Sequence, residues 1–530
     1  MQRRTLLKSS LFGAGFGLAG GLSKVTLIGA AANGSSSITP VVETTSGKVR
    51  GVLHAGVHTF RGIPYGASTA GANRFLPPRK TGPWTGVRDA FQNGHSSPQV
   101  APAPSAIGAG LRGYAAQGED CLVLNVFSNG VSASGDNKKR PVMMWIHGGG
   151  YTYGSGGSLG YDGGNLARNG DVVVVCINHR LNIVGHLFLG HAGSVIENSG
   201  NAGMLDIVAA LQWVRDNIAS FGGDPGNVTI FGQSGGGGKV STLLAMPSAK
   251  GLFHKAIVES GSTLKQMTKD EARQTTDKVM AALGTKSPAE LQQVPIDKLL
   301  AAMGSGTRFG PVVDGSALPH DPFDPEAPVE SLDVPMLVGT TETEGSYFAP
   351  PELLSMDEAA ARARLRDRLQ GDGDRIYDLF RSSRPKATPS ELYFTISAFP
   401  TSAHVQVERK AAKAKAPAYL YQIRWRTPVE GGRRLSPHCI EIPFAMQNHW
   451  QLPEMVGTGP ELQPLADKVS GAWIAFARTG NPNHAGIPKW TAYSSADRTT
   501  MIVDNEWKAM SDPNREERIA MATFTRLPMF

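Results

Sequence analysis

The segment that most constrains the fold is residues 227–240, where a short apolar run leads into a serine set between glycines. Val228 to Phe231 is rich in β-branched and aromatic residues, which is typical of a buried strand. Gly232 to Gly236 then reads Gly-Gln-Ser-Gly-Gly, and residues 239–245 can continue as a helix. A sharp turn between a strand and a helix strains the serine backbone and leaves room only for glycine two residues to either side. The pattern predicts that Ser234 is a nucleophile at the apex of such a turn.

The Gly-x-Ser-x-Gly motif occurs a second time, from Gly156 to Gly160, with Ser158 at its centre. The residues before that copy have the composition of a loop, and no strand precedes them. The glycines after Ser234 have an alternative interpretation as a flexible loop, since each glycine costs a helix about 1 kcal/mol relative to alanine. A loop, however, needs no strand leading directly into it. The context therefore favours Ser234 over Ser158.

Apolar runs alternating with helical stretches such as 205–219 predict an α/β fold, with a large, mostly parallel mixed sheet covered by helices on both faces. The expected strands are 122–127, 142–146, 172–177, 228–231, 335–339 and 419–423. Alternating segments between residues 41 and 64 predict an antiparallel edge that opens this sheet. Helical insertions are expected near 269–303 and 357–399, as the lid of a ligand crevice or as extra packing layers. We expect residues 33–530 to form one domain.

Residues 1–32 are expected to be a signal peptide of the twin-arginine type. Arg3 and Arg4 begin a basic region, residues 9–22 are weakly apolar and rich in glycine, and Ala30 to Ala32 offers a cleavage site. The alternative is an uncleaved anchor, but the apolar stretch is too short and too rich in glycine for a strong transmembrane helix. The leader predicts export to the periplasm or the exterior of a bacterial cell.

Charge and cysteine content argue against several classes of protein. The formal net charge is +7, and it falls to +3 without residues 1–32, which carry four basic residues and no acid. This balance gives little support for a nucleic-acid or membrane partner. The basic cluster at 410–415 has the spacing of a solvated helix face. Cys121, Cys176 and Cys439 can form at most one disulfide, which excludes a disulfide-stapled scaffold.

A serine nucleophile needs donors for the oxyanion that forms during attack. Upstream of Ser234, an apolar run ends in His147-Gly-Gly-Gly, and successive glycines at a strand end can aim backbone N–H groups at one point. Gly149 and Gly150, with Gly235 beside the serine, would supply three donors. His147 precedes the serine, whereas the catalytic residues of such folds follow the order Ser, Asp or Glu, His. We therefore expect His147 to pack against or orient the glycine loop.

Candidates for the acid and the base lie downstream of Ser234. Glu342 and Glu344 both follow the strand expected at 335–339, and their positions alone do not choose between them. Of the histidines after Glu344, His438 is the one set in a loop between expected elements. The alternative interpretation of His438 is a loop histidine that faces solvent.

The chain resembles the type-B carboxylesterase family, whose members include cholinesterases and para-nitrobenzyl esterases. The resemblance extends from about residue 41 to 505, and its motifs lie at 60–65, 119–126, 147–150, 201–225, 232–236, 310–315 and 490–504. It implies the α/β-hydrolase fold and hydrolysis of small-molecule carboxylic esters through an acyl-enzyme intermediate, with no metal or organic cofactor. It also implies a catalytic triad of Ser234, Glu344 and His438, with Gly149, Gly150 and Gly235 as the oxyanion hole.

The chain departs from the common family pattern at a few positions. The family commonly has Glu before the nucleophile and Ala after it, where this chain has Gln233 and Gly235. The family's bridging partner for Cys121 is absent, so we expect Cys121 to be unpaired. Residues 98–120 contain one aromatic residue, Tyr114, which argues against a cholinesterase-like cation–π site.

Two other functions use the same fold. The acyl chemistry also serves carbamates and amides, which are the main alternative substrates. A non-catalytic binding protein is the second alternative, because fold does not determine function. Family members of that kind lose triad residues, whereas this chain keeps all three.

Overall fold

The computed structural model describes residues 36–100, 107–111, 116–190, 196–304, 307–413 and 415–524. The expected signal peptide at 1–32 and Tyr114 lie outside these residues. No helix within the described ranges is both long and apolar enough to cross a membrane.

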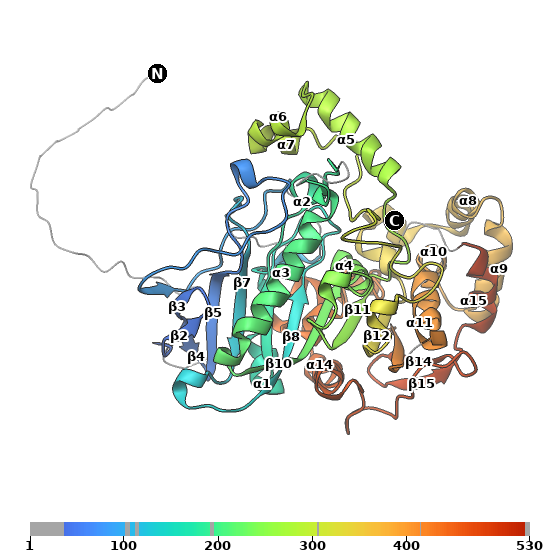
Figure 1. The fold of residues 1–530 in the computed structure, drawn as a ribbon. Coiled ribbons are helices and arrows are strands. Elements are labelled where there is room, and N and C mark those ends of the chain that lie inside the picture. The colour runs from blue at the N-terminus through green and yellow to red at the C-terminus, as the bar shows by residue number, and fades with distance from the viewer. Residues whose placement is uncertain are drawn as a thin grey trace, which may run out of the picture. The chain divides into compact units, whose positions relative to one another are not determined.

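Twelve strands of the described residues form one sheet, which runs through the centre of Figure 1. Seven neighbouring strands, from β9 to β14 in the spatial order below, are parallel, and the strands toward both edges pair antiparallel. The spatial order is β1 (Ser37–Ile38), β4 (Val52–His54), β5 (Val57–Pro64), β7 (Val123–Ser128), β9 (Val173–Ile177), β8 (Arg140–Ile146), β10 (Gly223–Gln233), β11 (Lys255–Glu259), β12 (Met336–Thr341), β13 (Ala418–Ile423), β14 (Thr499–Val503) and β15 (Lys508–Ser511). The α/β fold with a mostly parallel mixed sheet is confirmed.

The antiparallel edge is more divided than the sequence predicted. Strands β2 (Val42–Thr44) and β3 (Gly47–Arg50) leave the main sheet and form a second one with β6 (Val87–Asp89). Gly51 lies between β3, which belongs to the second sheet, and β4, which belongs to the main sheet. A Cβ atom at this position would overlap the carbonyl oxygen of Thr59. The close backbone approach at Gly51 is where the chain passes from one sheet to the other.

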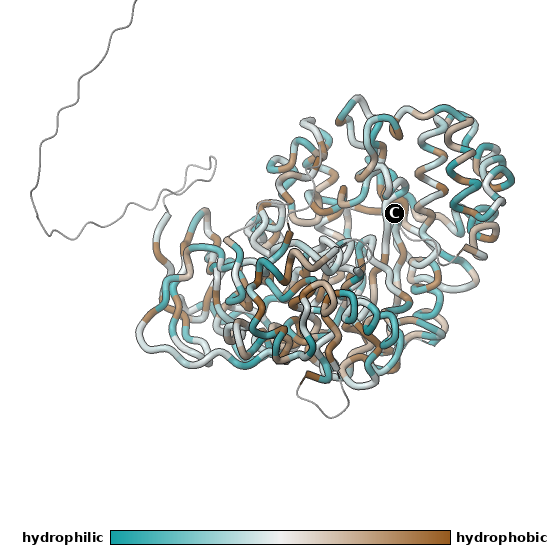
Figure 2. The backbone as a smooth tube through the Cα atoms, turned by 90° about the horizontal axis from the view of Figure 1, so that it is seen from above, coloured by the Kyte–Doolittle hydropathy of each residue, from teal (hydrophilic) through white to brown (hydrophobic). Residues whose placement is uncertain are grey.

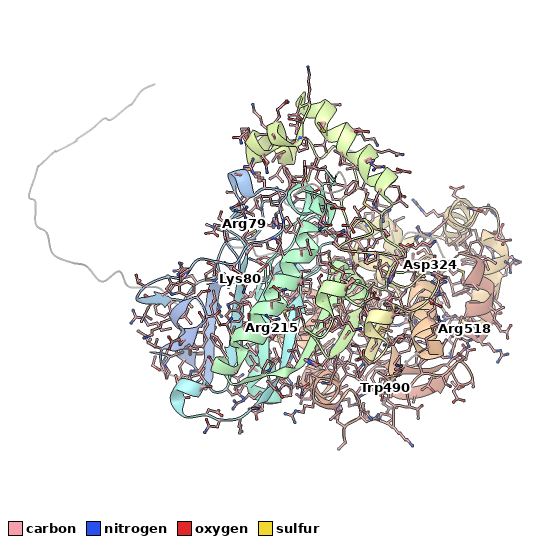
Figure 3. The ribbon with its side chains drawn as sticks, viewed as in Figure 1. Arg79, Lys80, Arg215, Asp324, Trp490 and Arg518 are labelled. Carbon is pink, nitrogen blue, oxygen red and sulfur yellow. The ribbon has the colours of Figure 1, made fainter. Side chains whose placement is uncertain are left out.

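Two apolar layers lie on the two faces of the main sheet. Side chains of β8 alternate between them, as expected for a strand buried on both faces. Val142, Met144 and Ile146 belong to the layer that contains α3 (Ala202–Asn217), which crosses in front of β8 in Figure 1. Met143 and Trp145 belong to the opposite layer, which contains α14 (Leu462–Thr479). Trp490, labelled in Figure 3, is buried in this second layer.

The two regions of expected helical insertion contain six helices within the described residues. These are α5 (Lys269–Leu283), α6 (Pro288–Gln293) and α7 (Ile296–Ala301), followed by α8 (Glu358–Arg368), α9 (Gly373–Ser383) and α10 (Pro389–Ser397). Each group packs around an apolar cluster of its own, separate from the two layers on the sheet. Hydrophilic and hydrophobic residues are interspersed along the backbone in Figure 2. Both regions therefore have apolar cores of their own beside the central sheet, and their role as a lid stays a prediction.

The remaining helices connect or cover the strands. They are α1 (Gly164–Gly170), α2 (Asn182–His186), α4 (Gly235–Leu243), α11 (Thr401–Lys413), α12 (Ile442–Ala445), α13 (Pro453–Val456) and α15 (Arg515–Met521). All three cysteines are buried and unpaired, so the prediction for Cys121 is confirmed.

The basic cluster at 410–415 is not wholly a solvated face, which corrects the sequence prediction. Lys410 is buried on α11, where it continues the buried stripe of Ala403, Gln406 and Val407 at helical spacing. Its ammonium group donates a hydrogen bond to the Ser331 carbonyl oxygen. Burial lowers the pKa of Lys410 to about 8.

Candidate active site

Ser234 forms the turn between β10 and α4. Its backbone has φ 60° and ψ −126°, a conformation that costs a residue with a side chain about 1–3 kcal/mol. The Ser234 N–H donates to the Glu259 carbonyl oxygen at 2.8 Å, and the Ser234 carbonyl oxygen accepts from the Gly238 N–H at 2.9 Å. Because α4 begins at Gly235, the following glycines are helical, and the flexible-loop interpretation is wrong.

Close packing explains the glycines two residues on either side of Ser234. A Cβ atom at Gly232 would lie 2.5 Å from the Ile146 carbonyl oxygen, and one at Gly236 would lie closer still. Real Cβ atoms do not approach that far, so a larger residue would push α4 away from the neighbouring strand β8. The prediction that only glycine fits at these two positions is confirmed.

Ser234 is half-buried and lines a pocket together with His438. The walls combine the glycine loop after β8 with aromatic and apolar side chains from four separate segments of the chain. The lining residues are Leu111, Gly148, Gly149, Tyr153, Gly154, Tyr161, Gln233, Ser234, Tyr347, Phe348, His438 and Cys439. Leu111 comes from the segment between β6 and β7.

Glu344, and not Glu342, is the acid that meets His438. One carboxylate oxygen of Glu344, Oε2, contacts His438 Nδ1, and the other accepts from the Thr341 N–H at 2.8 Å. The side chains are 2% and 1% exposed, respectively, so solvent scarcely weakens this contact. Glu342 instead faces Arg424, with 3.4 Å between its Oε1 and the arginine Nε.

The environment of His438 makes it a stronger base than a free histidine. Burial favours the neutral ring, yet the Cys439 sulfur and the Glu344 carboxylate together hold the pKa of His438 well above its ordinary value. The side-chain amide nitrogen of Gln233 lies 3.3 and 3.2 Å from the two ring nitrogens, and Cys439 Sγ donates to Gln233 Oε1 at 3.1 Å. Sequence reasoning noted Gln233 only as a departure from the family pattern. The contact between Gln233 and the His438 ring shows that Gln233 is part of the site.

Two further buried acids, which sequence reasoning missed, lie near the triad residues. Burial, and then the charge of Glu441, raises the pKa of Glu259 to about 8. Burial, and then the charge of Glu344, raises the pKa of Glu441 to about 7. Glu259 accepts a hydrogen bond from Trp473 Nε1 at 2.7 Å, and Glu441 accepts one from Ser260 Oγ at 3.1 Å. The available signal was local, since Glu259 ends an apolar strand and Glu441 lies three residues after His438.

The three glycines expected to form the oxyanion hole come together. Gly149 and Gly150 have φ of 87° and 60°, and their N–H groups donate to no protein atom among the described residues. Gly235 is the first residue of α4, so its N–H has no acceptor within the helix. A Cβ atom at Gly235 would lie 2.5 Å from the Cα atom of Gly150, which places the two glycines in direct contact. Three N–H groups are therefore available beside Ser234.

His147 packs beside the glycine loop and does not line the pocket. Its ring stacks on His179 with 4.6 Å between centroids, and its Nδ1 lies 2.9 Å from the Gly148 carbonyl oxygen. This placement agrees with the expected role in orienting the loop.

Comparison with known proteins identifies a consistent set of relatives. A model described as the Carboxylesterase family matches residues 38–522. A para-nitrobenzyl esterase of Bacillus subtilis is 35% identical over 90% of this chain and 97% of the relative, and a phenmedipham hydrolase of Pseudarthrobacter oxydans is 32% identical over 91% and 99%. Among solved structures, an esterase of Clostridium hathewayi, described as hydrolysing aliphatic aromatic polyesters, has a TM-score of 0.80 and 35% identity over 92% of this chain and 99% of that one.

Proposed function

Because this chain belongs to the carboxylesterase family and is a carboxylic-ester hydrolase, we propose that it cleaves small-molecule esters through an acyl-enzyme intermediate on Ser234. The single observation that carries this proposal is the arrangement of His438. Its ring contacts Glu344 at Nδ1 and lines the same pocket as Ser234 and the Gly149 backbone. A base, an orienting acid and oxyanion donors thus surround one hydroxyl group.

In the first half of the reaction, His438 takes the proton of Ser234 as the serine oxygen attacks the ester carbonyl carbon. The carbonyl π electrons move to the oxygen, whose charge is accepted by the N–H groups of Gly149, Gly150 and Gly235. Loss of one such donor typically costs about 2.7–4 kcal/mol of transition-state stabilisation. Glu344 holds the imidazole with Nδ1–H toward itself and stabilises the imidazolium.

The first tetrahedral intermediate then collapses: the carbonyl π bond re-forms, the bond to the alkoxy oxygen breaks, and His438 gives its proton to that oxygen, so the alcohol leaves and Ser234 stays acylated. Water then enters, His438 takes one of its protons, and the hydroxide oxygen bonds to the acyl carbon. Collapse of the second tetrahedral intermediate breaks the bond to Ser234, which recovers its proton from His438. The products are one carboxylic acid and one alcohol.

The pocket favours apolar or aromatic groups on the ester. Tyr153, Tyr161, Tyr347 and Phe348 line it beside the reacting serine, together with Leu111. Such walls bury apolar surface and leave few polar partners for a charged substrate. Aryl esters and esters of apolar acids are therefore the proposed substrates.

The signal-like segment at 1–32 supports export as part of the proposal. Its paired arginines, glycine-rich apolar stretch and alanine run are those of a twin-arginine leader. We expect the hydrolase to work in the periplasm or outside a bacterial cell. This part is tested by looking for the processed chain outside the cytoplasm. A variant with Arg3 and Arg4 both replaced by Lys should stay in the cytoplasm.

The serine assignment is tested by Ser234→Ala, with Ser158→Ala as the matched control from the second Gly-x-Ser-x-Gly motif. We expect Ser234→Ala to lower kcat on a p-nitrophenyl ester by about 10⁶-fold, and Ser158→Ala to change it less than about threefold. Diethyl p-nitrophenyl phosphate should transfer one diethylphosphoryl group to the wild type and to Ser158→Ala, but none to Ser234→Ala, as seen by intact mass. Turnover of a matched p-nitrophenyl carbamate above that of the ester would contradict the proposed substrate class.

A further inference from the structure

Lys239 is a fully buried lysine with no carboxylate partner, placed directly behind the oxyanion loop, residues 147–150. It lies on α4, five residues after Ser234, and its side chain is 0% exposed. Its Nζ donates to the His147 carbonyl oxygen at 3.1 Å and to the Gly150 carbonyl oxygen at 2.7 Å, and it lies 5.2 Å from the centre of the Tyr151 ring. Within the described ranges it forms no ion pair. Since burying an ammonium group is costly, its position calls for a compensating role.

Lys239 supplies two of the hydrogen bonds that hold the backbone of the oxyanion loop. The His147 and Gly150 carbonyl oxygens accept from Lys239, and the Gly148 carbonyl oxygen contacts His147 Nδ1. The Gly149 carbonyl oxygen accepts from the N–H groups of residues 152 and 153, each at 3.2 Å. All four carbonyls are thus engaged within the protein, whereas the Gly149 and Gly150 N–H groups are not. Three successive glycines are intrinsically flexible, so these bonds restrict where the N–H groups point.

The Gly150 carbonyl group, which accepts a hydrogen bond from Lys239, also explains why the residue after the nucleophile is Gly235. A Cβ atom at Gly235 would lie 2.5 Å from the Cα atom of Gly150, and closer still to the carbonyl oxygen that Lys239 binds. The space of an alanine methyl group at position 235 is therefore filled by this carbonyl. Gly235, where the family commonly has Ala, and Lys239 form one arrangement.

The histidines around Lys239 are neutral, so the lysine is the cation that this group can carry near neutral pH. His147, His179 and His186 each place Nδ1 next to a backbone carbonyl oxygen, while each Nε2 is buried without a partner among the described residues. Burial lowers the pKa of His147 and of His186 to about 3, and that of His179 well below its ordinary value. Burial lowers the pKa of Lys239 to about 7. Burial also raises the pKa of the neighbouring Tyr151, whereas the charge of Arg308 acts to lower the pKa of Tyr151.

We propose that Lys239 is a positioning residue for ester hydrolysis: it ties both ends of the oxyanion loop to the nucleophile helix and places a positive charge behind the site where the oxyanion forms. This proposal rests on the proposed function. Lys239 does not touch the substrate and acts through the Gly149 and Gly150 N–H groups. In a buried, low-dielectric setting, a fixed charge and fixed donors stabilise a developing anion more than they do in water.

The first test is Lys239→Met, with Lys410→Met as the control for removal of a buried lysine that does not line the pocket. We expect Lys239→Met to lower kcat on a p-nitrophenyl ester by about 10- to 100-fold with KM changed less than about threefold. Lys410→Met should lose thermal stability and keep kcat within about twofold. Equal losses of kcat in both variants, or a wild-type kcat in Lys239→Met, would overturn the proposal.

A transition-state analogue separates a defect in the oxyanion hole from a general loss of structure. An alkyl trifluoromethyl ketone bonds its carbonyl carbon to the Ser234 oxygen, sends the π pair to its own oxygen and leaves the serine proton on His438. Its inhibition constant should rise in Lys239→Met by the same factor as kcat falls. The matching methyl ketone, which bears no such oxyanion, should bind both proteins alike. Equal weakening of the two ketones would contradict a role in the oxyanion hole.

The second test is a double-mutant cycle with Gly235→Ala. Alone, Gly235→Ala should push the Gly150 carbonyl away from Lys239 and lower kcat by about 30-fold or more. In the Lys239→Met background that carbonyl is no longer held, so the same change should cost less than about fivefold. Additive losses would show that the two positions are independent and would overturn the proposed arrangement.

The pH profile gives a readout that packing alone would not produce. The ratio of wild-type kcat to Lys239→Met kcat should be largest near pH 6 and fall toward pH 9, because the ammonium charge is lost through a pKa of about 7. His438 titrates in both proteins and cancels in the ratio. A ratio independent of pH would overturn the charge part of the proposal.

If Ser234→Ala kept activity or phosphoryl labelling, the proposed function itself would fail; normal labelling with an unimpaired Lys239→Met would overturn only the role of Lys239.

Discussion

The buried ionisable groups near Ser234 form one basic cluster and one acidic cluster. The basic cluster consists of Lys239, His147, His179 and His186 and lies behind the oxyanion loop. The acidic cluster consists of Glu344, Glu441 and Glu259 and lies behind His438. During acyl transfer, negative charge grows on the substrate oxygen and positive charge grows on the imidazole. Each cluster therefore opposes in sign the charge that develops next to it.

Burial acts on both clusters, and the difference lies in how each one avoids an excess of charge. In the basic cluster the three imidazoles are neutral and one lysine retains a proton up to a pKa of about 7. In the acidic cluster one carboxylate is paired with His438, while Glu259 and Glu441 hold protons up to pKa values of about 8 and 7. A buried site keeps one useful charge and neutralises the remainder.

Among changes to the two clusters, Glu344→Gln is expected to have the largest effect on kcat. An amide no longer holds His438 in the required tautomer or stabilises its charged form, so kcat should fall by about 10⁴-fold. Glu342→Gln is the matched control, because Glu342 faces Arg424 instead, and it should cost less than about threefold. Steady-state kinetics on one p-nitrophenyl ester would measure both, and the reverse order of losses would identify Glu342 as the acid.

A smaller effect is expected on the acid side of the pH profile. Because the pKa of His438 is raised, kcat/KM should fall about tenfold for each pH unit below that raised value, and the limb should lie above pH 6.5. Glu441→Gln should lower kcat more at pH 8 than at pH 6, because the Glu441 carboxyl is already neutral below its pKa of about 7. Equal loss at both pH values would show that the charge of Glu441 has no part in stabilising the imidazolium.

The smallest effects concern stability, and here the two clusters should respond to pH in opposite directions. A carboxyl whose pKa rises on folding keeps its proton when the unfolded chain has lost it, so Glu259 should make stability fall between about pH 4.5 and 8. A lysine whose pKa falls on folding is neutral when the unfolded chain is charged, so Lys239 should make stability rise between about pH 7 and 10.5. Thermal melting of Glu259→Gln and Lys239→Met should show each slope reduced, by a few degrees in Tm. Unchanged slopes would contradict the shifted pKa values.

The parts of the site that could be predicted are those whose information is local. The strained turn at Ser234 was predictable because its strand, serine and helix are consecutive in the sequence, even though the contact that requires glycine at 232 and 236 is with Ile146 of the neighbouring strand β8. The glycine loop at 147–150 was predictable because successive glycines end an apolar run. The choice of Glu344 over Glu342 came from the family resemblance, since both acids follow the same strand and only their partners distinguish them.

The prediction for Lys410 was wrong for a related reason. Its spacing with neighbouring basic residues indicated a solvated face, whereas α11 turns this side chain toward the Ser331 carbonyl oxygen. Helical periodicity identifies which residues share a face, but a neighbouring segment decides whether that face meets water. The same limit hid Lys239, Glu259 and Glu441, whose side chains read as ordinary charged residues in the sequence.

The sequence by itself determined the alternation of strands and helices, the turn that presents Ser234 and the set of residue types needed for acyl transfer. Without the family resemblance, only tertiary structure shows which acid meets His438, and it alone decided which lysine binds the oxyanion loop and which carboxyls hold their protons. The physical reason is that each of these properties depends on burial and on partners that are distant in sequence. Glu344 and His438 are 94 residues apart, and Lys239 and Gly150 are 89 apart, so only the folded chain brings them together.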